Sequence, residues 1–111
     1  MKPLDWFSAL TLFECIVDDG QPREELFELR VIVVQAEDET SAREKAEAHA
    51  RHGEPEYENA DGGRVTWVLR EVLTVEPLYL DAITDGDEVF SAYLGKGDAK
   101  AVRQILARRA S

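Results

Sequence analysis

The stretch from Tyr57 to Val75, YENADGGRVTWVLREVLTV, constrains the fold more than any other part of the chain. Its Asp61-Gly62-Gly63 sequence favours a tight turn, because Asp and Gly tolerate the left-handed backbone that hairpin turns need. The residues after the turn are mostly β-branched, aromatic or charged, which is typical of a strand. We therefore expect a hairpin with a short strand at Tyr57 to Asn59 and a long strand at Arg64 to Val75.

One residue of the long strand breaks its pattern. A period of two predicts one face made of Val65, Trp67, Leu69, Leu73 and Val75, and Glu71 alone interrupts it. A carboxylate on an apolar face has to be paired, protonated or part of a site. Glu71 is either a polar anchor in a ligand groove or a residue that a bulge or strand end exposes to water, and the second arrangement is the more common.

Two strands and a helix are expected before this hairpin. Trp6 to Val17 is apolar on both faces, as in a strand near the middle of a sheet, and Glu25 to Ala36 alternates like its antiparallel neighbour. Ser41 precedes Glu44 by three residues, which predicts a capping box at the start of a helix that stops at Gly53.

A further strand and a helix are expected after the hairpin. Pro77 ends the long strand, and Glu88 to Leu94 offers a last strand with alternating apolar residues. Asp98 can cap a terminal helix, whose Val102, Ile105 and Leu106 form a narrow apolar stripe.

The fold class is therefore α+β, with the element order ββαβββα. We expect a mostly antiparallel sheet of about five strands, one helix packed on a face and a basic helix at the C-terminus. A chain of 111 residues fits one domain that needs no disulfide. Residues 1–94 are expected to form this domain, and residues 95–111 a basic helical extension of it.

Charge is divided unevenly along the chain, whose net charge is −10. Residues 95–111 hold five basic side chains and one acidic one, a net charge of +4, while the first 94 residues hold 8 basic and 22 acidic ones, a net charge of −14. The acidic body argues against binding to nucleic acid or to an anionic membrane through the protein as a whole. Nucleic acid contact is expected only through the C-terminal helix.

Compartment and covalent chemistry follow from the N-terminal residues and the cysteine content. Cys15 is the only cysteine, so no intrachain disulfide can form, and a reducing compartment fits. Glu14 interrupts the N-terminal apolar run before a signal peptide or a membrane span is complete. We expect a cytoplasmic protein that does not interact with a membrane.

Residues with reactive side chains do not form a recognisable catalytic or metal-binding motif. His49 and His52 lie three apart on the expected helix and could serve zinc only with a third ligand, and the paired aspartates lie in turns where Asp bonds its own backbone. No catalytic residue, metal ligand or cofactor is therefore expected. Cys15, within a hydrophobic strand, has the character of an inert core thiol.

The order of these segments resembles a known family. WFSALTLFEC, SAREKAEAHA, YENADGGRVTWVLREVLTVEPL and DGDEVFSAYL together resemble the bacterial domain-of-unknown-function 4288 family over about residues 6–94. The resemblance implies a small bacterial α+β fold. It brings no activity and no catalytic residues, and the basic tail looks like an addition to the family pattern.

Three classes of function stay open. The first is a non-enzymatic interaction module, of the immunity or antitoxin kind or a homodimer, whose contact is made by a sheet edge, the acidic face or the terminal helix. The partner-binding residues expected on that helix are Lys100, Arg103, Arg108 and Arg109. The second is a small-molecule binder or small hydrolase with a groove on the sheet, lined by four side chains: Glu71, Arg30, Trp67 and His49. The third is nucleic acid contact by the basic helix. An enzyme is the less expected outcome, and a protein partner or a second copy is the most expected one.

Overall fold

Four strands form one antiparallel sheet in the computed structural model, which describes residues 3–52, 56–58 and 62–110, with side chains described to residue 108. The strands are β1 (Asp5–Asp18), β2 (Leu26–Ala36), β3 (Glu56–Glu58) and β4 (Arg64–Pro77). Their order across the sheet is β2-β1-β4-β3. The expected α+β class and the antiparallel sheet are confirmed, and in the described residues the sheet has four strands instead of five.

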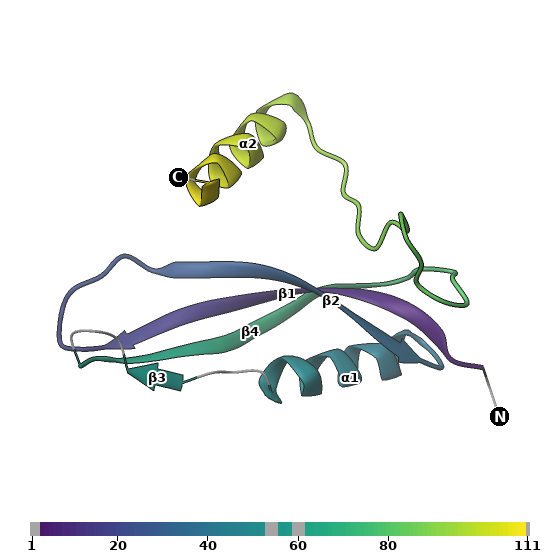
Figure 1. Cartoon of the computed structure of the whole chain (residues 1–111), viewed down its shortest axis with the longest axis horizontal. Coiled ribbons are helices and arrows are strands. Elements are labelled where there is room, and N and C mark those ends of the chain that lie inside the picture. The colour runs from purple at the N-terminus through teal and green to yellow at the C-terminus, as the bar shows by residue number, and fades with distance from the viewer. Residues whose placement is uncertain (1–2, 53–55, 59–61, 111) are drawn as a thin grey trace.

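The N-terminal strand lies in the middle of the sheet, as its apolar character on both faces predicted. β1 pairs with β2 from Asp5 opposite Ala36 to Cys15 opposite Leu26, without a register shift. Its other side pairs with β4. In Figure 1 the three long strands run side by side as one strongly twisted ribbon.

One face of the sheet is covered by α1 (Glu39–His52), which makes the core. Ala42, Ala46 and Ala50 are the buried side chains of this helix, and their small size lets it lie close to the strands. Two clusters of buried side chains result. The larger contains Phe7, Ala9, Val34, Ala36, Ala42, Ala46, Val72 and Val75, and the smaller contains Phe13, Ala50 and Leu69.

The cap of α1 differs from the expected one. The helix begins at Glu39, and the Ser41 backbone N–H donates to Asp38 Oδ1 at 2.8 Å. Asp38 is thus the N-cap residue, and Ser41 belongs to the first turn. The capping-box prediction placed the start too late because Asp38 and Ser41 are both good caps, and sequence alone did not choose between them. The expected stop at Gly53 lies outside the described residues.

The long strand β4 contains two register shifts, and they overturn the expected face assignment. Opposite β1, the pairs run Leu10–Thr74, Thr11–Val72, Leu12–Glu71 and Phe13–Leu69, so one residue is skipped at each shift. Val72 therefore joins the buried face in place of Leu73, and Glu71 moves to the opposite face. A strict period of two could not predict this, because each extra residue reverses the alternation.

The segment after β4 contains no strand in the described residues, so the expected strand at Glu88 to Leu94 is wrong. The Leu78 N–H still donates to the Trp6 carbonyl at 2.9 Å, but Tyr79 adopts a left-handed backbone with φ of 55° and turns the chain out of the sheet. The apolar alternation around Phe90 fits a strand, yet Glu88 to Ser91 pair with no strand and instead line a pocket with the end of β4. Helix α2 (Lys96–Ala110) follows and, in Figure 1, lies apart from the sheet.

Candidate functional site

Three of the four residues expected in a ligand groove lie together on the face that α1 covers. The Arg30 guanidinium lies 3.9 Å from the centre of the Phe13 ring and 5.7 Å from the centre of the Trp67 ring. His49 of α1 and Arg30 of β2 line the same cavity, of about 370 Å³, with Phe13 and Ala50. Arg30 and Trp67 belong to the strands on either side of β1 and flank Phe13, because Thr11 pairs with Arg30 and Cys15 pairs with Trp67.

Glu71 does not join this group. It pairs with Leu12 on the face of the sheet that α1 leaves open, and it is exposed. The two register shifts of β4 are the cause, so the irregularity in the sequence marks a bulged strand. The carboxylate that Arg30 contacts is Glu28, whose Oε1 accepts from Arg30 Nε.

The second feature is the free edge of β2. β2 is the outermost strand on its side of the sheet, and its pairing with β1 has no bulge over eleven residues. Four side chains of this strand that face away from α1 are apolar and exposed, and they are Phe27, Leu29, Val31 and Val33. A long edge strand with exposed apolar side chains is a template for another strand.

The opposite edge of the sheet is protected at β3, which pairs only with Arg64 to Thr66 and leaves the rest of β4 as the edge. β3 has only three residues, and two of them, Glu56 and Glu58, are charged. Arg64 of β4 forms an ion pair with Glu56 at 2.8 Å. Short length and charge are the means by which sheet edges avoid pairing. The rest of that edge belongs to β4, which carries two register shifts, so it is less regular than the edge of β2.

A groove runs beside the free edge of β2. Five consecutive residues of the strand, Leu26 to Arg30, line it together with Ile105 and Leu106 of α2, and its volume is about 770 Å³. Ile105 and Leu106 are each more than half exposed, so they line this groove without being buried. The groove therefore lies between apolar side chains of β2 and of α2 that remain exposed to solvent.

The basic side chains expected to bind a partner lie along α2. Lys100, Arg103 and Arg108 are exposed. The side chain of Arg109 lies outside the described residues. In the part of the chain that the structure describes, α2 makes no close backbone contact with a strand or with α1. The charge of this helix is therefore carried on an arm beside the acidic body.

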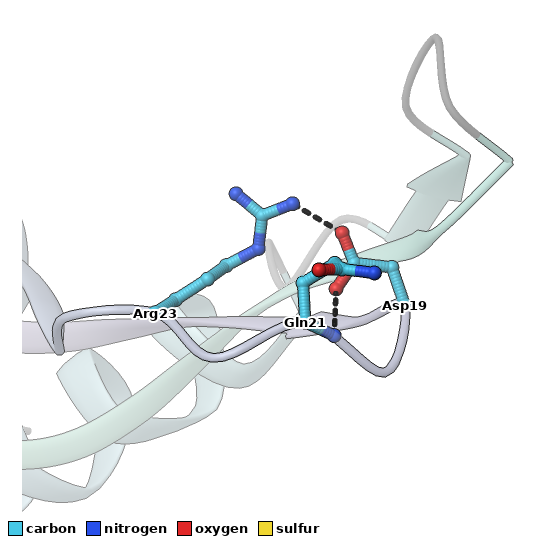
Figure 2. Close-up of polar contacts among 3 residues, drawn as sticks. All are labelled: Asp19, Gln21 and Arg23. Atoms are coloured by element: carbon cyan, nitrogen blue, oxygen red, sulfur yellow. Dashed lines mark hydrogen bonds and ion pairs between the residues drawn. The ribbon is translucent and has the colours of Figure 1, made fainter.

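The loop between β1 and β2 is fixed by a local carboxylate. Asp19 accepts hydrogen bonds from the Arg23 guanidinium and from the Gln21 backbone N–H, as Figure 2 shows. The Arg23 hydrogen bond, followed by that of Gln21, lowers the pKa of the Asp19 carboxyl below its ordinary value. This arrangement orders the turn that sets the register of the β1–β2 hairpin, and no geometry there points to catalysis.

Neither a metal-binding cluster nor a membrane-spanning helix is found in the described residues. Among residues 3–52, 56–58 and 62–110, no three His, Cys, Asp or Glu side chains gather in a way that could hold a metal ion. None of the helices described here has the length and apolar character to span a membrane. Cys15 is partly buried, between Leu26 and Trp67 in the sheet.

The sequence reasoning named a sheet edge as a possible contact surface but did not identify β2 as the strand that forms it. The signal was present, because Leu26 to Val34 has no Pro, no Lys and no Gly, the residues that usually interrupt or protect an edge. What the sequence did not reveal was the strand order. Only when β4 pairs with β1 does β2 become an edge.

Comparison with known proteins gives one family. Residues 6–91 match the family described as "Domain of unknown function (DUF4288)". This segment includes all four strands and α1, and it ends before α2. Neither the curated proteins nor the solved structures contain a match to the chain.

Proposed function

Since the chain belongs to the DUF4288 family, whose description carries no activity, we propose from its structure that it is a non-enzymatic protein-interaction module. The observation that supports this is the free edge of β2 with its exposed apolar side chains, beside the groove that α2 borders. Such an edge binds an extended segment of another chain through backbone hydrogen bonds, and apolar side chains add affinity.

Charge favours one kind of partner over another. The body, with its net charge of −14 over the first 94 residues, attracts a basic protein surface and repels nucleic acid. A basic effector neutralised by an immunity or antitoxin-like protein would be such a partner. Arg103 and Arg108 on α2 offer the opposite charge, which suits an acidic surface such as the body of a second copy.

Site-specific photo-crosslinking in the native host tests this function. A photoreactive amino acid at Leu29, which is 62% exposed on the free edge, should give a discrete crosslinked protein band. The same amino acid at Tyr57, which is 50% exposed on the protected edge, is the matched control and should give none. Equal crosslinking from both positions, or none from Leu29, would remove the β2 edge as an interaction site.

A second candidate rests on the cavity around Arg30. An arginine stacked on aromatic rings can hold a planar carboxylate, and 370 Å³ lies at the small end of ligand pockets. Benzoate is a suitable probe, with Trp67 fluorescence as the readout. Saturable quenching that Arg30→Lys abolishes would support a small-molecule binder, since lysine keeps the charge and loses the planar stack. No quenching would leave Arg30 as a structural residue.

A further inference from the structure

We propose that β2 pairs antiparallel with β2 of a second copy of this chain, with Leu29 opposite Leu29 at the two-fold axis. This inference rests on the proposed function and names its partner. The pairing covers Leu26 to Ile32, a stretch that α2 borders without close backbone contact in the described residues. Farther along, Lys45 Nζ donates to the Gln35 carbonyl at 2.7 Å, which limits the free edge at that end.

Charge complementarity selects the second copy as the occupant. In an antiparallel pair around a two-fold axis, a register centred on Leu29 places Glu28 opposite the partner's Arg30 and Arg30 opposite the partner's Glu28. These side chains share the α1 face and already form an ion pair within one strand. Opposite charges facing each other across strands stabilise a sheet, and like charges destabilise it.

Neighbouring registers lack this complementarity. Centring the pair on Glu28 places two glutamates opposite each other, and centring it on Arg30 places two arginines opposite each other. Pairing Leu29 with the partner's Arg30 is excluded for another reason, since it would set the α1 face of one copy opposite the open face of the other. A register centred on Val31 leaves Glu28 and Arg30 opposite Val34 and Ile32, so neither charge gains a partner.

The apolar face supports the same register. Phe27 lies opposite the partner's Val31, so that the exposed apolar side chains of the two strands form one continuous row across the axis. An aromatic side chain opposite a β-branched one is a favourable cross-strand pair. The added strand enters the groove beside β2, where Ile105 and Leu106 of α2 contact it.

Mass in solution is the first test. The 12.5 kDa chain should sediment as a dimer of twice that mass. Leu29→Lys, which places two ammonium groups together at the axis, should sediment as a monomer with unchanged circular dichroism. Tyr57→Lys, on the protected edge, is the matched control and should remain a dimer.

Charge reversal tests the register. Glu28→Arg and Arg30→Glu should each weaken the dimer about tenfold, because each places like charges across the axis. The double variant Glu28→Arg/Arg30→Glu should restore dimer affinity. In a Cys15→Ala background, a nitroxide at Leu29→Cys should show strong dipolar broadening, whereas one at Glu58→Cys should show none.

The outcomes separate this inference from the proposed function. A monomeric wild-type chain that still crosslinks from Leu29 to another protein overturns the β2–β2 pairing and leaves the interaction module standing. A dimer that survives Leu29→Lys and dissociates when the chain ends at Leu94 assigns the contact to α2 and overturns the pairing. A monomer without crosslinks from Leu29 overturns both.

Discussion

Two buried hydroxyl groups in β1, of Ser8 and Thr11, differ in their hydrogen bonding. Thr11 Oγ1 donates to the Arg30 carbonyl at 2.9 Å. Ser8 Oγ is buried, and in the described residues it has no hydrogen-bond partner. An unpaired buried hydroxyl costs free energy that removal of the group recovers, whereas a paired one contributes to stability.

Ser8→Ala and Thr11→Val should therefore act in opposite directions. Ser8→Ala should leave the free energy of unfolding unchanged or raise it, and Thr11→Val should lower it by about 1 kcal/mol. Urea unfolding at one protein concentration gives both values. A loss of stability in Ser8→Ala as large as that in Thr11→Val would show that Ser8 Oγ has a partner after all.

Asp19 is the residue for which pH has a defined effect. Its folded pKa is lowered by Arg23, so the carboxylate stabilises the turn fully above the ordinary aspartate pKa, and this stabilisation is lost as the pH falls through the lowered value. Carboxyl NMR titration should give a low pKa for Asp19 in the wild type. In Arg23→Gln the value should rise toward the ordinary one, while an unchanged value would assign the shift to Gln21 alone.

Arg43 of α1 supports the irregular part of β4. Its Nη1 donates to the Val72 carbonyl at 2.8 Å, beside the register shifts. Arg43→Ala should lower the free energy of unfolding by about 1.5 kcal/mol, because the bond comes from a charged donor. Arg51→Ala, which also removes an exposed arginine from α1, is the control and should change little. Equal losses in both variants would make the effect one of helix propensity.

At the scale of elements, the sequence predicted most strands and helices, and the misses have physical causes. The two long strands before α1, the long strand ending at Pro77 and both helices lie where the periodicity indicated. The break at Glu71 indicated the bulge that exposes this residue, whereas the number and position of the register shifts could not be predicted from a pattern of period two. For the candidate site, Arg30, Trp67 and His49 do lie together, but the edge status of β2 depends on strand order.

Helix α2 is an element whose removal should leave the rest intact. Ending the chain at Leu94 should leave the melting temperature of the sheet and α1 unchanged, because α2 packs on neither in the described residues. The full-length and shortened chains should both carry Leu29→Lys, so that pairing between copies does not add to the melting temperature of either. A fall of several degrees in calorimetry would show that α2 packs on the body in solution.

At the scale of the whole molecule, the arm makes the chain more extended than its length requires. The radius of gyration is 16.9 Å, against about 13 Å for a compact domain of roughly 100 residues. The acidic body and the basic arm are thus held apart within one chain, as Figure 1 shows for α2 and the sheet.

The difference between the two sheet edges also sets how far such an assembly can grow. A sheet with two open edges is divalent and adds copies without limit, which is the route to fibres. β3 is short and charged, and the part of β4 that it leaves uncovered is irregular because of the two register shifts. Under the proposed β2–β2 pairing these features disfavour the addition of further copies, and lengthening β3 with apolar residues should promote a polymer.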